Sequence, residues 1–326
     1  MTQAKAIRIF ETGGPEVMQY VDVDVPAPGP GEVTVKQHAI GLNYIDVYFR
    51  TGLYPQPLPA GIGMEASGVV EAVGQGVTHV KPGDRVAYAG RPTGAYAAMR
   101  TMPADILVRL PDAIDFETGA AMMLQGMTAQ YLIRDSYRVQ PGDTVLFHAA
   151  AGGVGLIACQ WAKAIGVTMI GTVSTDEKAE IAKANGCTHT IVTGREDIAK
   201  RVRELTDGKG VDVVFEMLGG EHTAKSVRCL GDFGRIIVYG AATGHRTQLD
   251  PGILYAKGAS IHGLWLTYLA AKAEVMQKAW EQLSSWIAQG HLHPVIGHTL
   301  PLANAAQAYR LLQEGKNFGK VVLNIA

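Results

Sequence analysis

The sequence predicts an α/β protein with two domains, one built on a doubly wound parallel sheet and the other mainly on antiparallel strands. Three observations predict this fold class. The 326 residues are more than one hydrophobic core usually serves. Short β-rich runs broken by Gly and Pro fill the first part of the chain, whereas strands and helices alternate from about residue 125. A glycine-rich turn joins the first strand of the alternating part to its first helix.

The first domain is expected over residues 1–124. Its apolar runs, such as 32–40, are separated by turn-forming stretches such as PAPGPGE at 26–32. This pattern favours a distorted, largely antiparallel β-domain. The segment 267–326 ends in one more apolar run, which has no place in a six-stranded parallel sheet. We therefore expect this segment to complete the first domain.

The second domain is expected over residues 125–266. The runs expected to form its strands are 144–148, 167–173, 188–192, 211–218, 234–240 and 259–266. Helical segments lie between most of them, and parallel strands need such crossovers, so a doubly wound sheet is predicted. The sixth run is apolar and belongs at the sheet edge, where it favours pairing with a second copy of the chain in a twofold dimer.

The first turn of the second domain has the chemistry of a phosphate-binding loop. Ala150, Gly152 and Gly155 give the spacing A-x-G-x-x-G between a strand and a helix. Free N–H groups at the start of that helix would face a diphosphate, and Gly152 and Gly153 bring no Cβ to its path. Gly155 permits close packing of the helix on the sheet. An ordinary tight turn is the alternative, but its place at the head of a six-strand series favours a dinucleotide-binding Rossmann fold.

The end of the second strand indicates which dinucleotide binds. An acidic residue there would bind the adenosine 2′-hydroxyl of NAD, but this strand runs into Ser174 without one. Asp176 follows and fits the first turn of the next helix better. Ser174 and Lys178 offer a hydroxyl and a cation to a 2′-phosphate, which favours NADPH. The alternative is that Lys178 is a solvated helix lysine.

The overall composition argues against several classes of function. Lys and Arg number 29 and Asp and Glu number 30, so charge gives no reason to expect nucleic acid or a membrane surface as a partner. The first residues lack the apolar core of a signal peptide, and no apolar run reaches the roughly 18 residues that span a bilayer. Cys159, Cys187 and Cys229 suggest no disulfide framework, which suits a cytoplasmic location.

Two positions argue against a catalytic metal. Zinc alcohol dehydrogenases share the two-domain plan and carry G-H-E-x-x-G, whose His binds the catalytic zinc. This chain has Met64 in place of that His, and Asn43 where an earlier Cys ligand would stand. A catalytic zinc needs about three protein ligands. Glu65 and His148 offer two further donors, but we expect no metal.

Motifs along the whole chain resemble those of the quinone oxidoreductases, the zinc-free, zeta-crystallin-like branch of the medium-chain dehydrogenase/reductase superfamily. The motifs are GGPEVMQ, GLNYIDVYFRTGLYP, GMEASGVVEAVG, KPGDRVAY, HAAAGGVGLIACQWAKAIG and GKVVL. The resemblance implies a GroES-like catalytic first domain and NADPH bound in the cleft between the domains. It further implies hydride transfer to a quinone or a related conjugated carbonyl, and a homodimer.

The resemblance also assigns coenzyme contacts to residues from many segments. These residues are expected near the nicotinamide, the diphosphate, the 2′-phosphate or the adenosine, or in the C-terminal segment that closes over the coenzyme. They are Asn43, Asp46, Tyr48, Gln125, Thr128, Gly152, Gly153, Val154, Ser174, Lys178, Thr193, Tyr239, Gly240, Ala241, Ala242, Leu264, Trp265, Leu266, Asn317, Phe318 and Lys320. Many relatives have a Tyr where this chain has Thr193-Gly194, so Arg195 is a candidate to supply charge there. For Asn43, Asp46 and Tyr48, local capping of a helix start is the alternative.

Tyr54, Asn43 and Asp46 are the candidate catalytic residues. Tyr54 matches a tyrosine of mitochondrial-type enoyl thioester reductases, and the segment GLWL at 263–266 also resembles theirs. Reduction of an enoyl thioester or enone is therefore the alternative reaction, and an aromatic pocket wall is the alternative role for Tyr54. An NADPH-binding structural or RNA-binding protein with little turnover is a third possibility, against which the neutral charge balance argues.

Overall fold

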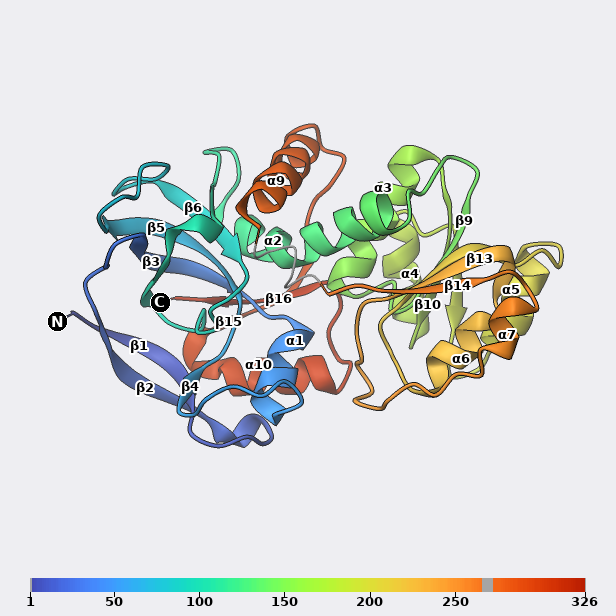
Figure 1. Cartoon of the computed structure of the whole chain (residues 1–326), viewed down its shortest axis with the longest axis horizontal. Helices are drawn as coiled ribbons and strands as arrows, with labels where there is room; N and C mark the ends of the chain where they lie inside the picture. The colour runs from blue at the N-terminus through green and yellow to red at the C-terminus, as the bar shows by residue number, and fades with distance from the viewer. Residues whose placement is uncertain (1, 266–271, 326) are drawn as a thin grey trace. The chain divides into compact units, whose positions relative to one another are not determined.

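The computed structural model describes residues 2–265 and 272–325 and divides into two compact units (Figure 1). The boundary between them falls inside helix α2 (Phe116–Tyr131). The first unit comprises Met1–Met127, Thr267–Ala288 and Pro294–Ala326, and the second comprises Thr128–Leu266 and Gln289–His293.

The second unit is built on a six-stranded sheet in which every pairing is parallel, with the order β11-β10-β9-β12-β13-β14. Its strands are β9 (Thr144–Phe147), β10 (Thr168–Val173), β11 (His189–Val192), β12 (Val211–Glu216), β13 (Leu230–Val238) and β14 (Ser260–Gly263). The central strands are apolar and buried, as expected for a sheet covered on both faces. By contrast, every residue of the edge strand β14 is exposed.

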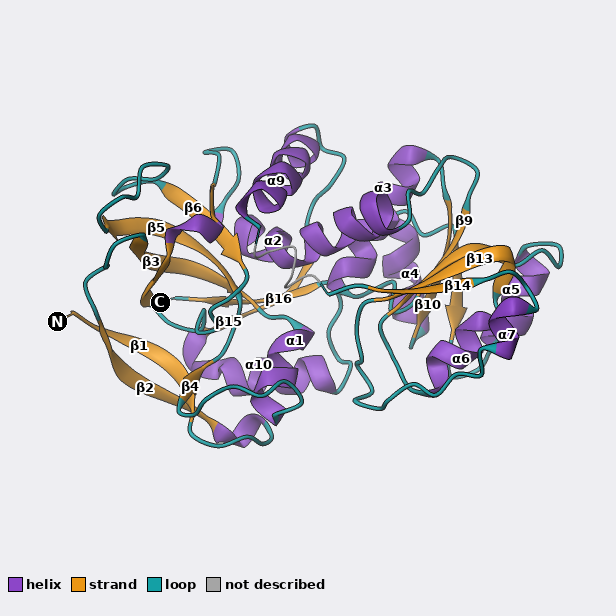
Figure 2. Ribbon diagram, viewed as in Figure 1, coloured by secondary structure: helices purple, strands orange, loops and turns teal. Residues whose placement is uncertain are grey.

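Helices flank this sheet on both sides, with α3 and α4 on one side and α5, α6 and α7 on the other (Figure 2). The helices of the unit are α3 (Gly153–Ile165), α4 (Asp176–Ala184), α5 (Ile198–Leu205), α6 (Glu221–Val227), α7 (Gly252–Tyr255) and the π-helix η3 (Leu132–Ser136). Thr175 and Asp197 cap the N-termini of α4 and α5 with their side-chain oxygens. Gly166 ends α3 in a left-handed conformation that suits a residue without Cβ.

The first unit contains a seven-stranded sheet with the order β15-β16-β3-β5-β6-β8, in which β7 also pairs with β3. A separate three-stranded sheet has the order β2-β1-β4. The strands are β1 (Thr2–Ile9), β2 (Met18–Val25), β3 (Glu32–Gly41), β4 (Ala60–Gly61), β5 (Glu65–Val73), β6 (Arg85–Ala89), β7 (Met99–Pro103), β8 (Leu107–Arg109), β15 (Ile296–Pro301) and β16 (Lys320–Asn324). β16 pairs antiparallel with β3, which joins the end of the chain to this sheet.

Within the described residues, the other helices are α1 (Tyr44–Thr51), α9 (Ala273–Ala288), α10 (Ala305–Gln313) and the 3-10 turns η1 (Pro15–Val17), η2 (Ala104–Ile106) and η4 (Leu302–Asn304). The main core of the first unit gathers inward-facing residues of its strands, such as Val33, Ile40 and Val86, with Tyr309 of α10. The parallel sheet and the mainly antiparallel unit confirm the predicted fold class. None of the helices in the described ranges has both the length and the apolar character that a membrane span requires.

Candidate coenzyme and active site

The glycine-rich turn of the second unit lies between β9 and α3, and it leaves no room for a side chain at Gly155 and little at Gly152. A Cβ on Gly155 would come within 2.6 Å of the carbonyl oxygens of Ala149 and Ala150, and one on Gly152 within 3.1 Å of Ala149 O. α3 begins at Gly153 with Gly152 as its N-cap, which has no side chain to cap it. The first N–H groups of such a helix have no intrahelical partner, so they are available to an anion.

Buried side chains of strand β10 and helix α6 hold this turn in place. His148, at the end of β9, lies 3.1 Å from Thr172 Oγ1 through Nδ1 and 2.8 Å from Ser226 Oγ through Nε2. Burial lowers the pKa of His148 to about 4, so the ring is neutral at pH 7. The next residue, Ala149, has a φ of 55°, an uncommon conformation for a residue with a Cβ. Its N–H donates to Thr172 Oγ1 at 3.3 Å, which helps to hold this strained corner.

The end of β10 presents the residues expected to face a 2′-phosphate. Ser174 is exposed, and Thr175 Oγ1 accepts the N–H of Lys178 at 3.2 Å to cap α4. Lys178 is half-buried, and burial lowers the pKa of its ammonium. On the neighbouring strand, Thr193 donates its N–H to Val173 O at 2.9 Å. The carboxyl ends of β10 and β11 therefore lie together, which is where doubly wound sheets bind ligands.

Other predicted residues of the second unit follow β13 and β14 at the same edge of the sheet. Tyr239 is half-buried with its ring 6.2 Å from that of Phe147, and its N–H donates to Glu216 O at 2.9 Å. Gly240, Ala241 and Ala242 follow it and are half-buried, as is Leu264, whereas Trp265 is 40% exposed and Thr128 is buried. Leu266 lies outside the described residues.

In the first unit, three polar side chains meet in a cluster that is closed to solvent. Lys320 Nζ donates to Glu65 Oε2 at 2.6 Å and to Asn43 Oδ1 at 2.9 Å, and Asn43 Nδ2 donates to Glu65 Oε2 at 2.7 Å. Glu65 Oε1 accepts the N–H of Leu124 in α2 at 2.7 Å. The side chains of Lys320 and Glu65 are 1% and 0% exposed. Pairing is what offsets the cost of burying these two charges.

Asp46, in the first turn of α1, is a fully buried carboxyl group beside this cluster. Its Oδ2 accepts the N–H of Asn43 at 3.0 Å and the hydroxyl of Tyr96 at 2.9 Å. Within the described ranges, Oδ1 has no hydrogen-bond partner. Burial raises the pKa of Asp46 to about 7, although the bonds from Tyr96 and Asn43 and the charge of Lys320 oppose the rise. Asp46 can therefore exchange a proton near neutral pH.

The aromatic candidates pack against one another around α1. The rings of Tyr48 and Tyr54 lie 5.2 Å apart in an edge-to-face arrangement, and Tyr54 also lies 5.7 Å from Phe49. Tyr48 is buried and Tyr54 half-buried. Burial raises the pKa of Tyr54, so its hydroxyl keeps its proton at neutral pH. These contacts suit an aromatic wall and leave the role of the hydroxyl a prediction.

The remaining candidates of the first unit are Gln125, Asn317 and Phe318. Gln125 Oε1 is buried, and no described residue supplies it with a hydrogen bond. Asn317 and Phe318 are half-buried just before β16, where the ring of Phe318 lies 6.2 Å from that of His298. The structure thus brings Asn43 and Lys320 into direct contact and places Asp46 next to them.

Sequence reasoning missed two residues in and beside the cluster as site residues. Glu65 was considered only as a metal donor, yet it accepts three hydrogen bonds. Tyr96 was not singled out, although it is the hydroxyl partner of Asp46. The available signal was the acidic residue inside the apolar segment GMEASGVV, because a charge in a buried strand needs partners.

In the described part of the chain, no three His, Cys, Asp or Glu side chains gather as a metal site would require. Met64 is buried at the position of the expected zinc ligand, and the amide of Asn43 is occupied by Glu65 and Lys320. The cation that meets Glu65 here is an ammonium group. That the enzyme works without metal stays a prediction.

The residues present fit a dinucleotide on two independent grounds. The first is the glycine turn, which a Cβ would block and which ends in helical N–H groups. The second is that Asp46 Oδ1 and Gln125 Oε1 are among the buried polar atoms that find no partner within the described residues. Buried polar atoms rarely stay unsatisfied, so these two favour a polar ligand.

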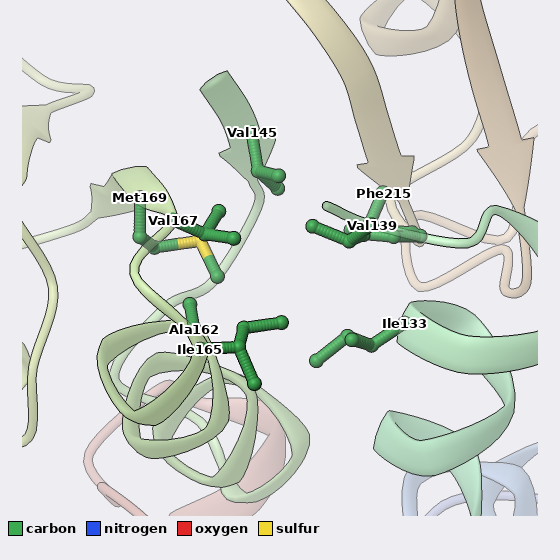
Figure 3. Close-up of a pocket in the computed structure, with 8 residues that line it drawn as sticks. All are labelled: Ile133, Val139, Val145, Ala162, Ile165, Val167, Met169 and Phe215. Atoms are coloured by element: carbon green, nitrogen blue, oxygen red, sulfur yellow. The ribbon is translucent and has the colours of Figure 1, made fainter. Parts of the chain in front are cut away.

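A separate hydrophobic gap lies inside the second unit (Figure 3). Its lining residues share apolar side chains and are Ile133, Val139, Val145, Ala162, Ile165, Val167, Met169 and Phe215. It is too narrow for a water molecule and offers no polar group. We regard it as a packing defect of the core rather than a ligand site.

Two known domain families match the chain. An alcohol dehydrogenase GroES-like domain matches residues 29–112, and a zinc-binding dehydrogenase domain matches residues 153–289. Together with the sheet and the glycine turn, they define an oxidoreductase of the medium-chain dehydrogenase/reductase class. The second match contains neither Asn43 nor Glu65, so its name does not bear on metal binding at the cluster.

Full-length relatives narrow this class. A quinone oxidoreductase of Pseudomonas aeruginosa is 47% identical over 322 residues, which cover 98% of this chain and 99% of that protein. The crystal structure of Escherichia coli quinone oxidoreductase complexed with NADPH superimposes with a TM-score of 0.96 at 41% identity, covering 98% and 100% of the two chains. A 2-haloacrylate reductase of Burkholderia is 41% identical, with 97% of each chain covered. The chain belongs to the zinc-free quinone oxidoreductase branch of the medium-chain dehydrogenase/reductase superfamily.

Proposed function

We propose that this protein is an NADPH-dependent quinone reductase that needs no metal ion. The observation that carries the proposal is the near-full-length similarity to quinone oxidoreductases, one of which is complexed with NADPH. When bound, the reduced nicotinamide supplies the hydride, and the protein supplies orientation and a site from which water is excluded. A quinone becomes aromatic on reduction, so the driving force lies in the substrate and little acid–base chemistry is asked of the protein.

In the second unit, we assign the diphosphate to the N–H groups of Gly153 and Val154, with Gly152 leaving space for it. Ser174 and Lys178 are assigned to the 2′-phosphate. The half-buried ammonium of Lys178 supports this role, because an anion would restore the solvation that burial removes. Further contacts to the ribose, the adenine and the nicotinamide are assigned to Thr128, Thr193, Tyr239, Gly240, Ala241, Ala242, Leu264, Trp265 and Leu266.

In the first unit, we assign the nicotinamide and the acceptor to Asp46, Tyr48, Tyr54 and Gln125. Asn43 acts through its backbone, because its amide is already bonded to Glu65 and Lys320 while its N–H holds Asp46. That bond occupies Oδ2 and leaves Asp46 Oδ1 for a ligand. It also opposes the effect of burial on the pKa of Asp46, which stays at about 7. Asn317 and Phe318 are assigned to closing the site, and Lys320 to positioning Asn43. Solvent or the hydroxyl of Tyr54 supplies the proton.

The direct test is turnover by protein from which metals have been removed. After exhaustive chelation, the protein should oxidise NADPH in the presence of a small para-quinone and form one hydroquinone per NADPH. Metal analysis of the same sample is the control. Activity that disappears on chelation and returns with zinc would contradict the proposal.

The coenzyme assignment has its own test. Replacing Lys178 with Ala should weaken NADPH binding about ten- to a hundredfold and leave NADH binding almost unchanged, because one charge-assisted contact to phosphate is lost. Lys183→Ala is the matched control, since Lys183 lies on the same helix and pairs with Glu180 at 2.9 Å. Equal affinity of the wild type for NADPH and NADH would overturn the assignment.

Reduction of a conjugated carbon–carbon double bond is the second candidate, favoured by the similarity to a 2-haloacrylate reductase. Such a reaction needs a polarised carbonyl and a proton at the α-carbon, hence a placed acid. Tyr54→Phe separates the two, since it keeps the ring and removes the hydroxyl. Quinone reduction should fall less than about tenfold, because loss of a general acid usually costs 10²–10⁴. The second candidate would be correct if the wild type does not reduce quinones but reduces crotonyl thioesters or 2-haloacrylates. Tyr54→Phe should then lower that activity about a hundredfold.

We further propose that the protein is a homodimer joined through the β14 edge of its parallel sheet. Every residue of β14 is exposed, with Ile261 at 37%, and Trp265 follows the strand at 40% exposure. An open edge with exposed apolar side chains at Ile261 and Trp265 favours strand pairing with a second copy. Light scattering should give the mass of a dimer for the wild type and of a monomer for Ile261→Glu. A wild-type monomer at all concentrations would contradict the arrangement.

We also propose a cytoplasmic location, supported by the free and buried state of Cys159, Cys187 and Cys229. Nucleic acid is not an expected partner, because the formal charge is −1. Filter binding with RNA at several salt concentrations would reveal a hidden basic site. Tight binding at physiological salt would contradict this expectation.

A further inference from the structure

Arg195 and Asp176 form a bidentate ion pair at the carboxyl ends of two neighbouring strands. Arg195 lies in the turn after β11, and Asp176 is the first residue of α4, which follows β10. Arg195 Nη1 donates to Asp176 Oδ2 at 2.7 Å, and Nη2 donates to Oδ1 at 2.5 Å. The two side chains are 58% and 70% exposed. The guanidinium group therefore rests on the first turn of α4 while staying open to solvent.

Backbone hydrogen bonds fix the position of the Arg195 main chain. The parallel pairing sets Val173 beside Val192, and the N–H of Arg195 donates to Val192 O at 3.1 Å. The adjacent carboxylate, Glu196, is directed elsewhere, because it accepts the N–H of Val192 at 2.7 Å and lies 3.5 Å from Arg201 Nε. Asp176 is thus the carboxylate that holds the head of Arg195 over α4.

The position of the guanidinium matters because Ser174 and Lys178 lie on either side of Asp176 in the sequence. Ser174 precedes α4, and Asp176 and Lys178 are its first and third residues. All three therefore lie in the first turn of the helix or directly before it. The held guanidinium adds a second cation to the residues assigned to the 2′-phosphate. Arginine binds phosphate through two parallel N–H groups, the same geometry that it uses here for Asp176.

An exposed ion pair is easily exchanged for a stronger partner. Surface pairs between single charges contribute little, whereas a phosphate carries more charge and offers more acceptor oxygens. A carboxylate left beside a bound 2′-phosphate would repel it. Asp176 therefore competes with the phosphate for the same donor groups.

We propose that Arg195 is a coenzyme-specificity residue, which exchanges Asp176 for the adenosine 2′-phosphate when NADPH binds. The inference rests on the proposed function, in that it takes the end of β10 as the site of that phosphate. Asp176 holds Arg195 in place before binding and weakens the affinity for the phosphate by competing for it. Discrimination between NADPH and NADH then depends on two cations, Lys178 and Arg195.

The test uses adenosine 2′,5′-bisphosphate and adenosine 5′-monophosphate as probes, which carry the phosphate difference without the nicotinamide. Calorimetry should show that Arg195→Ala weakens binding of the bisphosphate about ten- to a hundredfold and changes binding of the monophosphate less than about twofold. Asp176→Asn should strengthen binding of the bisphosphate by about two- to tenfold, because the competitor is removed. Arg195→Lys should fall between wild type and Arg195→Ala.

Arg228→Ala is the matched control, since Arg228 is an exposed arginine of the same unit that lies at the C-terminal end of α6. It should leave both affinities unchanged. If the wild type does not prefer the bisphosphate, the coenzyme assignment itself fails. If the wild type prefers it but Arg195→Ala binds both probes as before, only this inference is overturned. A weaker affinity in Asp176→Asn would overturn the exchange.

Discussion

The two units build their candidate sites from different kinds of chemical group. In the second unit, the glycine-rich turn is backbone and small side chains, and the buried titratable group beside it, His148, is neutral at pH 7. In the first unit, the site is a closed set of ionisable and amide side chains, with the ion pair of Glu65 and Lys320 at its centre. An unchanging diphosphate can be held by fixed N–H groups, whereas a reacting ring and its acceptor need polar side chains whose charge is controlled.

The largest expected effect concerns the buried ion pair. Lys320→Met should lower the free energy of unfolding by about 3–5 kcal/mol, because Glu65 would remain buried without its partner. Lys316→Met is the matched control, since Lys316 pairs with Glu314 at 2.6 Å but with side chains 68% and 49% exposed. Its cost should stay below about 1 kcal/mol. Urea unfolding measures both, and equal costs would remove the distinction between a buried and an exposed pair.

The next effect concerns the glycine turn. Gly155→Ala should destabilise the protein by about 1–3 kcal/mol, because the added methyl meets two backbone carbonyls that cannot move aside. Gly194→Ala is the control, since a Cβ there would meet no described atom within 4 Å. Gly155→Ala should lower the thermal unfolding temperature and weaken NADPH binding, whereas Gly194→Ala should leave the unfolding temperature unchanged. If Gly155→Ala changed neither thermal unfolding nor NADPH binding, the turn would be less tightly packed than we describe.

The third effect is a pH dependence of opposite sign in the two units. The pKa of Asp46 is raised to about 7, so its contribution to stability is full below about pH 4 and is lost as the pH rises through 7. The pKa of His148 is lowered to about 4, so its contribution is full above about pH 6.5 and is lost as the pH falls through 4. Each slope is at most about 1.4 kcal/mol per pH unit.

Single variants should separate these two slopes. Asp46→Asn removes the loss of stability that Asp46 causes as the pH rises. The stability of this variant should therefore increase from pH 4 to pH 7. His148→Gln should behave in the opposite way. Denaturant unfolding at several pH values measures both. Parallel pH profiles for the two variants would show that these groups do not titrate as their burial implies.

The difference between the units also explains how much the sequence could predict. The fold class and the family were confirmed because strand and helix periodicity and the spacing of Gly152 and Gly155 are local signals. The cluster of the first unit was only partly foreseen, because Asn43, Glu65 and Lys320 are up to 277 residues apart. Only the pairing of β3 with β5 and β16 brings them together. The ion pair of Asp176 and Arg195 likewise needed the structure, because the pairing of β10 with β11 is what brings the two residues together.

The most direct test of the account is a crystal structure of this protein with NADPH. We predict that the N–H groups of Gly153 and Val154 contact the diphosphate and that Ser174 and Lys178 contact the 2′-phosphate. Asp46 should face the nicotinamide or the acceptor, with Lys320 still bonded to Glu65 and Asn43 and no metal ion among them. A 2′-phosphate directed into solvent, or a metal ion bound by Asn43 and Glu65, would contradict the account.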